Sequence, residues 1–215
     1  MPRIVCISDT HNFMEQISVP DGDILVHSGD ATIKGTVDEI VVFDHWFSRL
    51  PHQYKIFVAG NHDWLFETNN RYARSLLDPK INYLQDSSAI IDGIKIYGSP
   101  WQPRFFDWAF NLNRGHELAE KWSLIPSDVE ILITHGPPNG ILDAVPRVWG
   151  IENTGCEELI KRVDQLAALG TLKLHIFGHI HCGYGVDERN GIKFVNASIC
   201  DEQYSPIQLP VVIDI

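Results

Sequence analysis

The sequence has few cysteines and no long hydrophobic run, and these absences exclude several classes of protein. No stretch approaches about 18 consecutive apolar residues, which argues against a membrane-spanning helix. The N-terminus shows no signal-peptide pattern, so we expect reduced thiols, a cytoplasmic location and no membrane partner. The four cysteines form no CxxC pair of the kind that binds zinc; they are Cys6, Cys156, Cys182 and Cys200.

Positive charge is also scarce. The 215 residues include 17 basic and 28 acidic side chains, which gives a formal net charge of −11. Proteins that bind long nucleic acid usually carry a basic surface, so the charge argues against long DNA or RNA as a partner. An anionic substrate would be repelled unless bound cations reversed the local field. The length fits one domain, residues 1–215.

Short apolar runs alternate with longer amphipathic segments, which predicts an α/β fold. Capping boxes at 36–39 and 154–157 predict helices that end before Pro51 and at Gly170, and two further helices are expected at about 64–77 and 116–124. Strands and helices alternate in the first half, which predicts parallel strands, and the second half predicts a second, mixed sheet. The expected strands are 3–7, 23–27, 54–58, 94–97, 130–134, 172–177, 193–196 and 209–213.

Five of the apolar runs are followed directly by Asp, Asn or His. Because the carboxyl ends of strands form the ligand crevice of α/β sheets, we expect these side chains to converge. Oxygen and nitrogen donors without thiolate suit Mn, Fe, Zn, Co or Ni. Two carboxylates, one amide and four imidazoles from these segments would make seven ligands, which suit two ions that share a bridge. The segments are Asp9-Thr10-His11, Gly29-Asp30, Gly60-Asn61-His62-Asp63, His135-Gly136 and Gly178-His179-Ile180-His181.

Each of these segments alone has an ordinary structural explanation. An Asp-x-His after a strand is often a turn or a helix cap, and a single histidine such as His135 can be a hydrogen-bonded core residue. The conjunction favours a metal site, since such groups cost roughly 1–3 kcal/mol each when buried without partners. The remaining histidines are expected in the core or on the surface: His27, His45, His52, His116 and His175.

The five segments resemble, in order, the signature of the calcineurin-like metallophosphoesterase superfamily: D-x-H, G-D, G-N-H-[DE], H-G and G-H-x-H. The segments 134–138 and 194–198 are most similar to its brain-239-type branch, the metallophosphoesterase-domain-containing proteins. Some relatives in that branch carry Gly in place of the first His of the last motif, whereas this chain keeps His179. The resemblance implies a four-layer α/β/β/α sandwich of two mixed sheets flanked by helices.

The resemblance also implies a dinuclear centre of two divalent ions, with Mn²⁺ as the expected metal. One ion would be held by Asp9, His11, His181 and a bridging Asp30. The other would be held by Asp30, Asn61, His135 and His179.

The activity implied is that of a metal-dependent phosphoric ester hydrolase, in which a metal-bridged hydroxide attacks phosphorus. The likeness makes His62 the general acid for the leaving group, oriented by Asp63. In the alternative interpretation, His62 only hydrogen-bonds the substrate.

A charge count favours a small phosphodiester as the substrate, and the resemblance implies the same class, with small cyclic nucleotides among its members. Two divalent ions, less the charges of Asp9, Asp30 and a bridging hydroxide, leave one positive charge, which a diester monoanion neutralises. Trp101 and the segment 104–108 are candidates to line the pocket, where a base could stack on an exposed tryptophan. Most of these aromatic residues are expected to pack at sheet edges instead, and Trp101 is the one predicted to contact the substrate. A phosphomonoesterase, a nuclease and a non-catalytic scaffold on the same fold remain alternatives.

Overall fold

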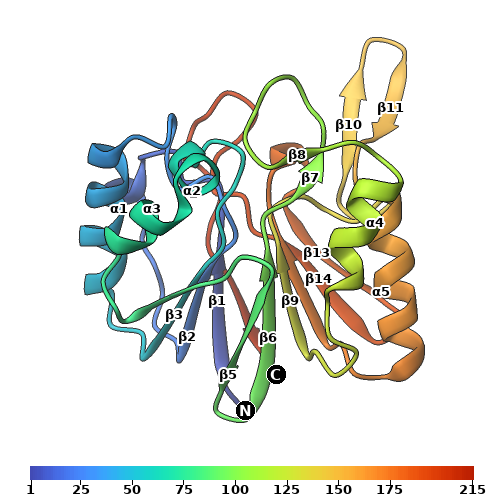
Figure 1. Cartoon of the computed structure of the whole chain (residues 1–215), viewed down its shortest axis with the longest axis horizontal. Helices are drawn as coiled ribbons and strands as arrows, with labels where there is room; N and C mark the ends of the chain where they lie inside the picture. The colour runs from blue at the N-terminus through green and yellow to red at the C-terminus, as the bar shows by residue number, and fades with distance from the viewer.

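The computed structural model describes residues 1–215 and places two large sheets face to face, with helices on both outer faces (Figure 1). The first sheet has the order β15-β1-β2-β3-β4, and its strands are parallel except for β15, which runs antiparallel to β1. Its strands are β1 (Arg3–Ile7), β2 (Ile24–His27), β3 (Tyr54–Phe57), β4 (Ile81–Tyr83) and β15 (Val211–Asp214).

The second sheet has the order β13-β14-β12-β9-β6-β5, with four parallel central strands and an antiparallel strand at each edge. Its strands are β5 (Ser87–Ile91), β6 (Ile94–Ser99), β9 (Ile131–Thr134), β12 (Leu174–Phe177), β13 (Gly185–Arg189) and β14 (Ile192–Asn196). Two short ribbons complete the strands: β7 (Gln102–Pro103) with β8 (Asn111–Leu112), and β10 (Ala144–Arg147) with β11 (Gly150–Asn153).

Helices cover the outer face of each sheet, which confirms the expected four-layer sandwich. Two 3₁₀ turns, η1 (Met14–Gln16) and η2 (His181–Gly183), lie in the loops. The first sheet carries α1 (Val37–Arg49), α2 (Trp64–Thr68) and α3 (Asn70–Ser75), and the second carries α4 (His116–Ser123) and α5 (Glu157–Leu169). No helix has the length and apolar character needed to cross a bilayer.

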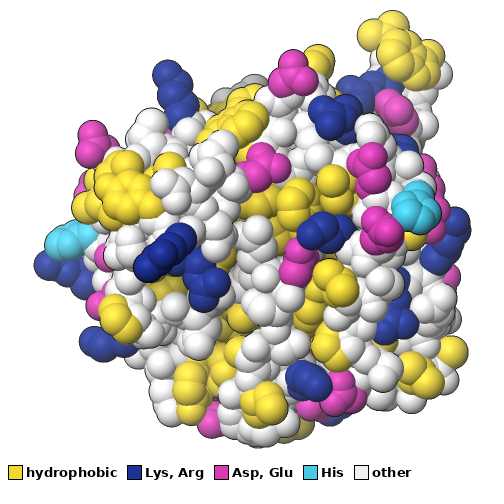
Figure 2. Space-filling model, in the orientation of Figure 1, with side chains coloured by type: hydrophobic (Ala, Val, Ile, Leu, Met, Phe, Trp, Pro, Cys, Tyr) yellow, Lys and Arg dark blue, Asp and Glu magenta, His cyan; other side chains and the backbone are white.

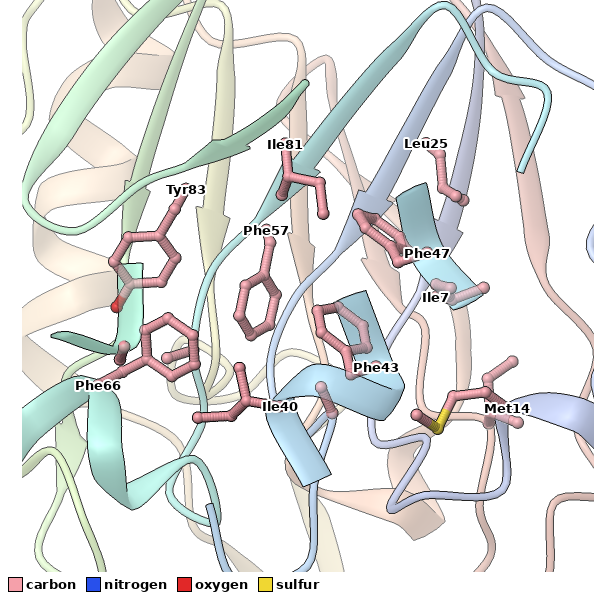
Figure 3. Close-up of a cluster of buried hydrophobic side chains, with 14 of the residues drawn as sticks. Ile7, Met14, Leu25, Ile40, Phe43, Phe47, Phe57, Phe66, Ile81 and Tyr83 are labelled. Carbon is pink, nitrogen blue, oxygen red and sulfur yellow. The ribbon is translucent and has the colours of Figure 1, made fainter. Parts of the chain in front are cut away.

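Alternation along the strands builds the core. In β1, Val5 and Ile7 pack with the helices, whereas Ile4 and Cys6 pack between the two sheets. On the helix side, Phe43 of α1 lies against Phe57 of β3 with ring centroids 4.8 Å apart, as Figure 3 shows. Burial of one such side chain contributes about 1.5–3 kcal/mol, so this apolar layer fixes α1 on the sheet.

The second sheet is buried in the same way on both faces. Ile131 and Ile133 of β9 face the first sheet, whereas Leu132 packs with α4 and α5 through Trp122 and Leu159. The two sheets are therefore packed together through the apolar cluster between them, and the parallel strands of both sheets end at one common edge. In Figure 1 this is the upper edge, opposite the two chain termini.

The sequence predicts the long elements well and the short ones poorly. All eight expected strands exist, but short or exposed strands such as β4, β5 and β13 carry little apolar signal and were not predicted. The helix expected at 64–77 is interrupted at Asn69, which ends α2 and caps α3 by accepting from the Tyr72 N–H (3.4 Å). The predicted capping box at 154–157 is wrong, because the Thr154 hydroxyl donates to the Asp143 carbonyl and Cys156 is the N-cap of α5.

The capping box of α1 provides a stability test. Thr36 accepts from the Glu39 N–H (3.3 Å), and the Glu39 carboxylate accepts from the Thr36 N–H (2.9 Å). Thr36→Ala should lower the free energy of unfolding by about 1 kcal/mol, measured by urea denaturation, because it leaves a helix N–H without its partner. Thr68→Ala is the control, since the Thr68 hydroxyl bonds back to the Trp64 carbonyl and caps nothing. Equal losses in both variants would contradict the assignment.

Candidate metal centre

The five polar segments of the sequence meet at the common edge of the two sheets. They follow β1, β2, β3, β9 and β12, and backbone hydrogen bonds join them: Asp9 N–H donates to the Gly29 carbonyl, and Gly178 N–H donates to that of His135. Several of these residues have left-handed backbones, with φ of 52° at Asp9 and 55° at Asp30. Such conformations are unfavourable outside glycine and are typical of functional sites.

The structure brings six of the seven predicted metal ligands together in two groups, and a third group, His11, Asp30 and His62, shares one member with each. Asp9, His11 and His181 form one group, and Asp30, His135 and His179 form the other; within each group the candidate donor atoms lie within 4.8 Å of one another. The seventh residue, Asn61, places its Oδ1 atom 2.9 Å from His135 Nε2.

The two groups are continuous with one another around Asp30. Its Oδ2 atom lies 3.3 Å from Nε2 of His135 and 4.0 Å from Nε2 of His11, which belongs to the other group. Asp30 therefore occupies the position expected of a bridging carboxylate.

Backbone carbonyls orient three of the imidazoles. Nδ1 of His11 lies 3.3 Å from the carbonyl oxygen of Thr32. Nδ1 of His135 lies 3.0 Å from the carbonyl oxygen of Ser28, and Nδ1 of His181 lies 2.8 Å from the carbonyl oxygen of Asp201. A carbonyl only accepts, so each Nδ1 carries a proton and each Nε2 is directed into the site. Histidine ligands of metals show this pattern, with the outer nitrogen donating to a fixed acceptor.

Charge balance also fits the binding of cations. Burial opposes the ionisation of Asp9 and Asp30, but the facing imidazoles outweigh it and hold the pKa of both carboxyls below the usual range. Burial likewise disfavours the charged forms of His135 and His181. Asp30 nevertheless raises the pKa of His135 to about 9, and Asp9 raises the pKa of His181 to about 9. Two buried carboxylates thus require positive charge, which either protons or metal ions can supply.

The other two histidines are neutral donors. Burial lowers the pKa of His11 to about 4, and burial together with the charge of His135 lowers the pKa of His179 to about 3. Neutral imidazoles with carboxylate and amide oxygens form a donor set that suits divalent transition ions. The residues present therefore fit a pair of such ions.

The family model for calcineurin-like phosphoesterases matches residues 2–183 of the chain. The chain belongs to the calcineurin-like phosphoesterase family. Metallophosphoesterase domain-containing protein 1 of Homo sapiens, and the same protein of Mus musculus, are 44% identical to it over 99% of this chain and 71% of the relative. A UPF0046 protein of Caenorhabditis elegans is 38% identical over 93% of this chain and 70% of its own length.

The family fold is also found in solved structures. A Staphylococcus aureus protein provisionally named as a 5'-nucleotidase superposes with a TM-score of 0.52 at 13% identity, covering 98% of this chain and 53% of that one. This chain thus spans about half the length of that structure, and the likeness concerns the fold alone. Membership of the family supports a metal-dependent phosphoric ester hydrolase.

The two predicted catalytic residues of this phosphoesterase have different surroundings. His62 Nδ1 lies 2.7 Å from the Ile33 carbonyl oxygen, which directs Nε2 towards Asp30 Oδ2 at 4.0 Å. The Asp63 carboxylate does not bind that ring; it accepts from the Gly60 and Thr32 N–H groups (2.8 and 3.1 Å). The expectation that Asp63 orients His62 is corrected here, because the Ile33 carbonyl orients the ring and Asp63 holds the neighbouring loops.

Two buried histidines that sequence reasoning left unassigned support the same loops. His27 Nδ1 accepts from the Gly29 N–H, so its Nε2–H donates to the Thr10 hydroxyl at 3.0 Å. His175 Nε2 lies 2.9 Å from the hydroxyl of Thr134, which itself donates to the Gly136 carbonyl. Both histidines lie within strands rather than after them, so no strand-end signal marked their role.

Asp9 is fixed from the far end of the chain. The Ser198 hydroxyl donates to Asp9 Oδ2 (2.9 Å), and the His179 N–H donates to the same carboxylate. Asn196 in turn donates to the Ile180 carbonyl at 2.8 Å. The segment after β14 therefore ties one ligand group to the loop that carries the last two histidines.

A cavity of about 460 Å³ opens over these residues. Trp101, the aromatic residue predicted at the substrate, is not part of its lining. The Trp101 Nε1–H donates to Asp86 (2.9 Å) and Lys121 Nζ lies 4.2 Å from its ring centroid, so the side chain is held at the sheet edge. The aromatic residues that do line the cavity are Phe105, Trp108 and Tyr204.

Glycine is required where the backbone passes closest to the ligands. A Cβ on Gly60 would collide with Asp30 and lie 2.7 Å from His135 Cε1, whereas a Cβ on Gly136 would meet Gln102 at an ordinary 3.5 Å. Gly60→Ala should therefore weaken metal binding by at least about tenfold, and Gly136→Ala should leave it nearly unchanged. Calorimetric titration of both proteins with Mn²⁺ checks this, and equal affinities would refute the packing explanation.

Proposed function

We propose that this protein is a dinuclear metal-dependent phosphodiesterase that hydrolyses small phosphodiesters, cyclic nucleotides among them. The observation that carries the proposal is the meeting of two ligand groups at one shared carboxylate, Asp30. Two divalent ions held there would lower the pKa of bound water and neutralise the phosphoryl oxygens. We assign one ion to Asp9, His11 and His181, the other to Asn61, His135 and His179, and Asp30 to both.

Manganese is the metal we propose, because the donors are imidazoles, carboxylates and one amide. None of the four cysteines belongs to either ligand group. Hard and intermediate donors of this kind suit Mn²⁺, whereas a thiolate set would favour zinc.

His62 is placed to act as the general acid. The Ile33 carbonyl holds Nδ1, and the side chain is only 8% exposed, so a protonated ring presents its Nε2–H to the cavity beside Asp30. When water attacks phosphorus and the bond to the leaving oxygen breaks, this proton passes to that oxygen. The proposal thus assigns proton transfer to His62 and the positioning of adjacent loops to Asp63.

The net charge of the site favours diesters. Two divalent ions, balanced by Asp9, Asp30 and one hydroxide, would retain a single positive charge, which matches a diester monoanion. The further positive charge of protonated His62 would leave with the proton that it gives to the leaving oxygen. Two of the arginines at the cavity do not alter this sum, because Arg147 pairs with Glu152 (2.8 Å) and Arg114 pairs with Glu157.

Metal analysis combined with a substrate panel tests the proposal. The purified protein, loaded with Mn²⁺, should bind two ions per chain and hydrolyse bis-p-nitrophenyl phosphate faster than p-nitrophenyl phosphate, with activity on cyclic nucleotides. Faster cleavage of the monoester would identify a phosphomonoesterase, and preference for oligonucleotides would identify a nuclease. A metal-loaded protein that cleaves none of them would indicate a non-catalytic scaffold.

A further inference from the structure

One side of the catalytic cavity is aromatic. A second cavity of about 600 Å³ adjoins it and shares three of its residues, Phe105, Trp108 and Tyr204. The rest of its lining is Trp64, Phe106 and Asp107. Phe105, Phe106 and Tyr204 are 45%, 75% and 44% exposed, so these rings offer an open apolar surface that is continuous with the metal centre.

Hydrogen bonds connect the loop 104–108 to neighbouring segments. Its ends are joined by the β7–β8 ribbon, and Asn111 Nδ2 donates to the carbonyls of Phe105 (3.2 Å) and Phe106 (2.9 Å). The Ala109 N–H donates to the Asn61 carbonyl at 3.2 Å, which connects the loop directly to the residue before His62. These hydrogen bonds anchor the aromatic surface to the loop that carries His62.

Two of these aromatic residues lie against the proposed general acid and its neighbours. The Trp108 ring covers His62, with centroids 4.1 Å apart and planes inclined at 30°. Tyr204 lies against His11 with centroids 4.8 Å apart and is 6.2 Å from His62. Its left-handed backbone, φ 59°, is held by Asp201, whose carbonyl accepts from the Tyr204 N–H at 3.0 Å.

We propose that this aromatic surface is the leaving-group subsite, and that the enzyme prefers phosphodiesters whose leaving alcohol carries a planar aromatic group. The leaving oxygen must lie next to the group that protonates it. Apart from the predicted metal ligands, the aromatic rings beside His62 are Trp108 and Tyr204, with centroids 4.1 and 6.2 Å away. Other parts of the lining are polar, such as the ion pair of Arg147 and Glu152 on the β10–β11 hairpin. The two substituents of a diester thus meet different surroundings, and the aromatic one is placed at His62.

Figure 2 shows that the hairpin at the upper right ends in hydrophobic side chains that point away from the body of the molecule. They belong to the tip, where Val148 is 101% and Trp149 is 83% exposed. Neither residue lines the cavity. Trp149 therefore provides a matched control for substitution of a tryptophan outside the proposed subsite.

The inference rests on the proposed function and specifies which bond breaks. Water adds its oxygen to phosphorus, the bond from phosphorus to the aromatic alcohol's oxygen breaks, and the His62 proton completes that alcohol. The proton lost by water restores the acid form of His62 in the next turnover. The products are an aromatic alcohol and the monoester that keeps the other substituent.

An unsymmetrical diester tests the inference through the identity of the alcohol released. Methyl 2-naphthylmethyl phosphate carries two alkoxide leaving groups of similar basicity, so chemistry alone gives little preference. With Mn²⁺, the wild type should release 2-naphthylmethanol in roughly tenfold excess over methanol, and the cyclohexylmethyl analogue should show a much smaller excess. Trp108→Ala should reduce the excess several-fold, whereas Trp149→Ala should leave it unchanged.

The product ratio does not depend on the overall rate, so it separates the subsite from general damage. If Trp108→Ala loses activity because the ring that packs on His62 is gone, Phe105→Ala provides the second test and should likewise reduce the excess of 2-naphthylmethanol. Phe105 lies beside His179, with ring centroids 6.3 Å apart, so this substitution leaves the ring on His62 in place. Equal release of both alcohols by the wild type, or an equal excess with the cyclohexylmethyl diester, would overturn the subsite and leave the phosphodiesterase intact. A wild type that cleaves neither diester would refute the proposed function, and the subsite with it.

Discussion

Asp30→Asn should abolish the hydrolase activity and reduce the metal content below two ions per chain. Asp30 lies close to members of both ligand groups, 3.3 Å from His135 and 4.0 Å from His11, and its side chain is only 3% exposed. Asparagine keeps the shape but removes one of the two negative charges that balance the cations. We expect kcat/KM on bis-p-nitrophenyl phosphate to fall by roughly 10³-fold, with metal content measured by plasma emission spectroscopy.

Asp128→Asn is the matched control for this substitution. Asp128 forms an exposed ion pair with Lys95 at 2.8 Å and precedes the amino end of β9, away from the edge that carries the ligands. It should retain both ions and full activity. An Asp30→Asn protein that still holds two ions and turns over at the wild-type rate would disprove the bridging role.

His62→Gln should slow the hydrolysis of alkyl diesters far more than that of p-nitrophenyl diesters. Glutamine can still donate to the Ile33 carbonyl, but it has no proton to give at the position of Nε2. General acid catalysis contributes about 10²–10⁴-fold when the leaving group is poor and little when it is good. Comparison of kcat for a dialkyl phosphate and for bis-p-nitrophenyl phosphate, at equal metal content, measures this difference.

An equal loss on both esters would remove the acid role from His62 and leave it as a substrate contact. His45→Gln controls for the substitution itself, since His45 lies on α1, whose buried face packs on the first sheet rather than on the metal centre. It should change neither rate.

The candidate metal ligands could be found in the sequence because each follows a strand, and each of those strands can be recognised from its own apolar residues. Apolar runs such as Ile4–Ile7 end in Asp9 and His11, and parallel strands deliver such residues to one edge of a sheet. Local chemistry and a simple topological rule were therefore sufficient to expect these segments to converge, and the resemblance to the family signature assigned the seven candidate ligands among them. The prediction of helix starts was less accurate. The capping box at 154–157 was wrong because the Thr154 hydroxyl donates to the Asp143 carbonyl instead of capping α5.

The surroundings of those ligands could not be read in the same way. The acceptor that orients His62 is the Ile33 carbonyl, and a backbone oxygen has no sequence signature. Trp101 and Trp108 are equally plausible pocket residues by type, but Asp86 and Lys121 hold the first at the sheet edge. Tyr204 reaches His11 only because the loop after β14 folds back over the first strand.

The sequence by itself thus determined the composition of the metal centre, since donor chemistry resides in side chains and strand ends are local features. The tertiary structure alone decided how that centre is oriented and which aromatic rings enclose it. Those contacts join different loops, from Ile33 with His62 to Tyr204 with His11 near the two ends of the chain, and their geometry depends on the packing of two sheets, which no local pattern encodes.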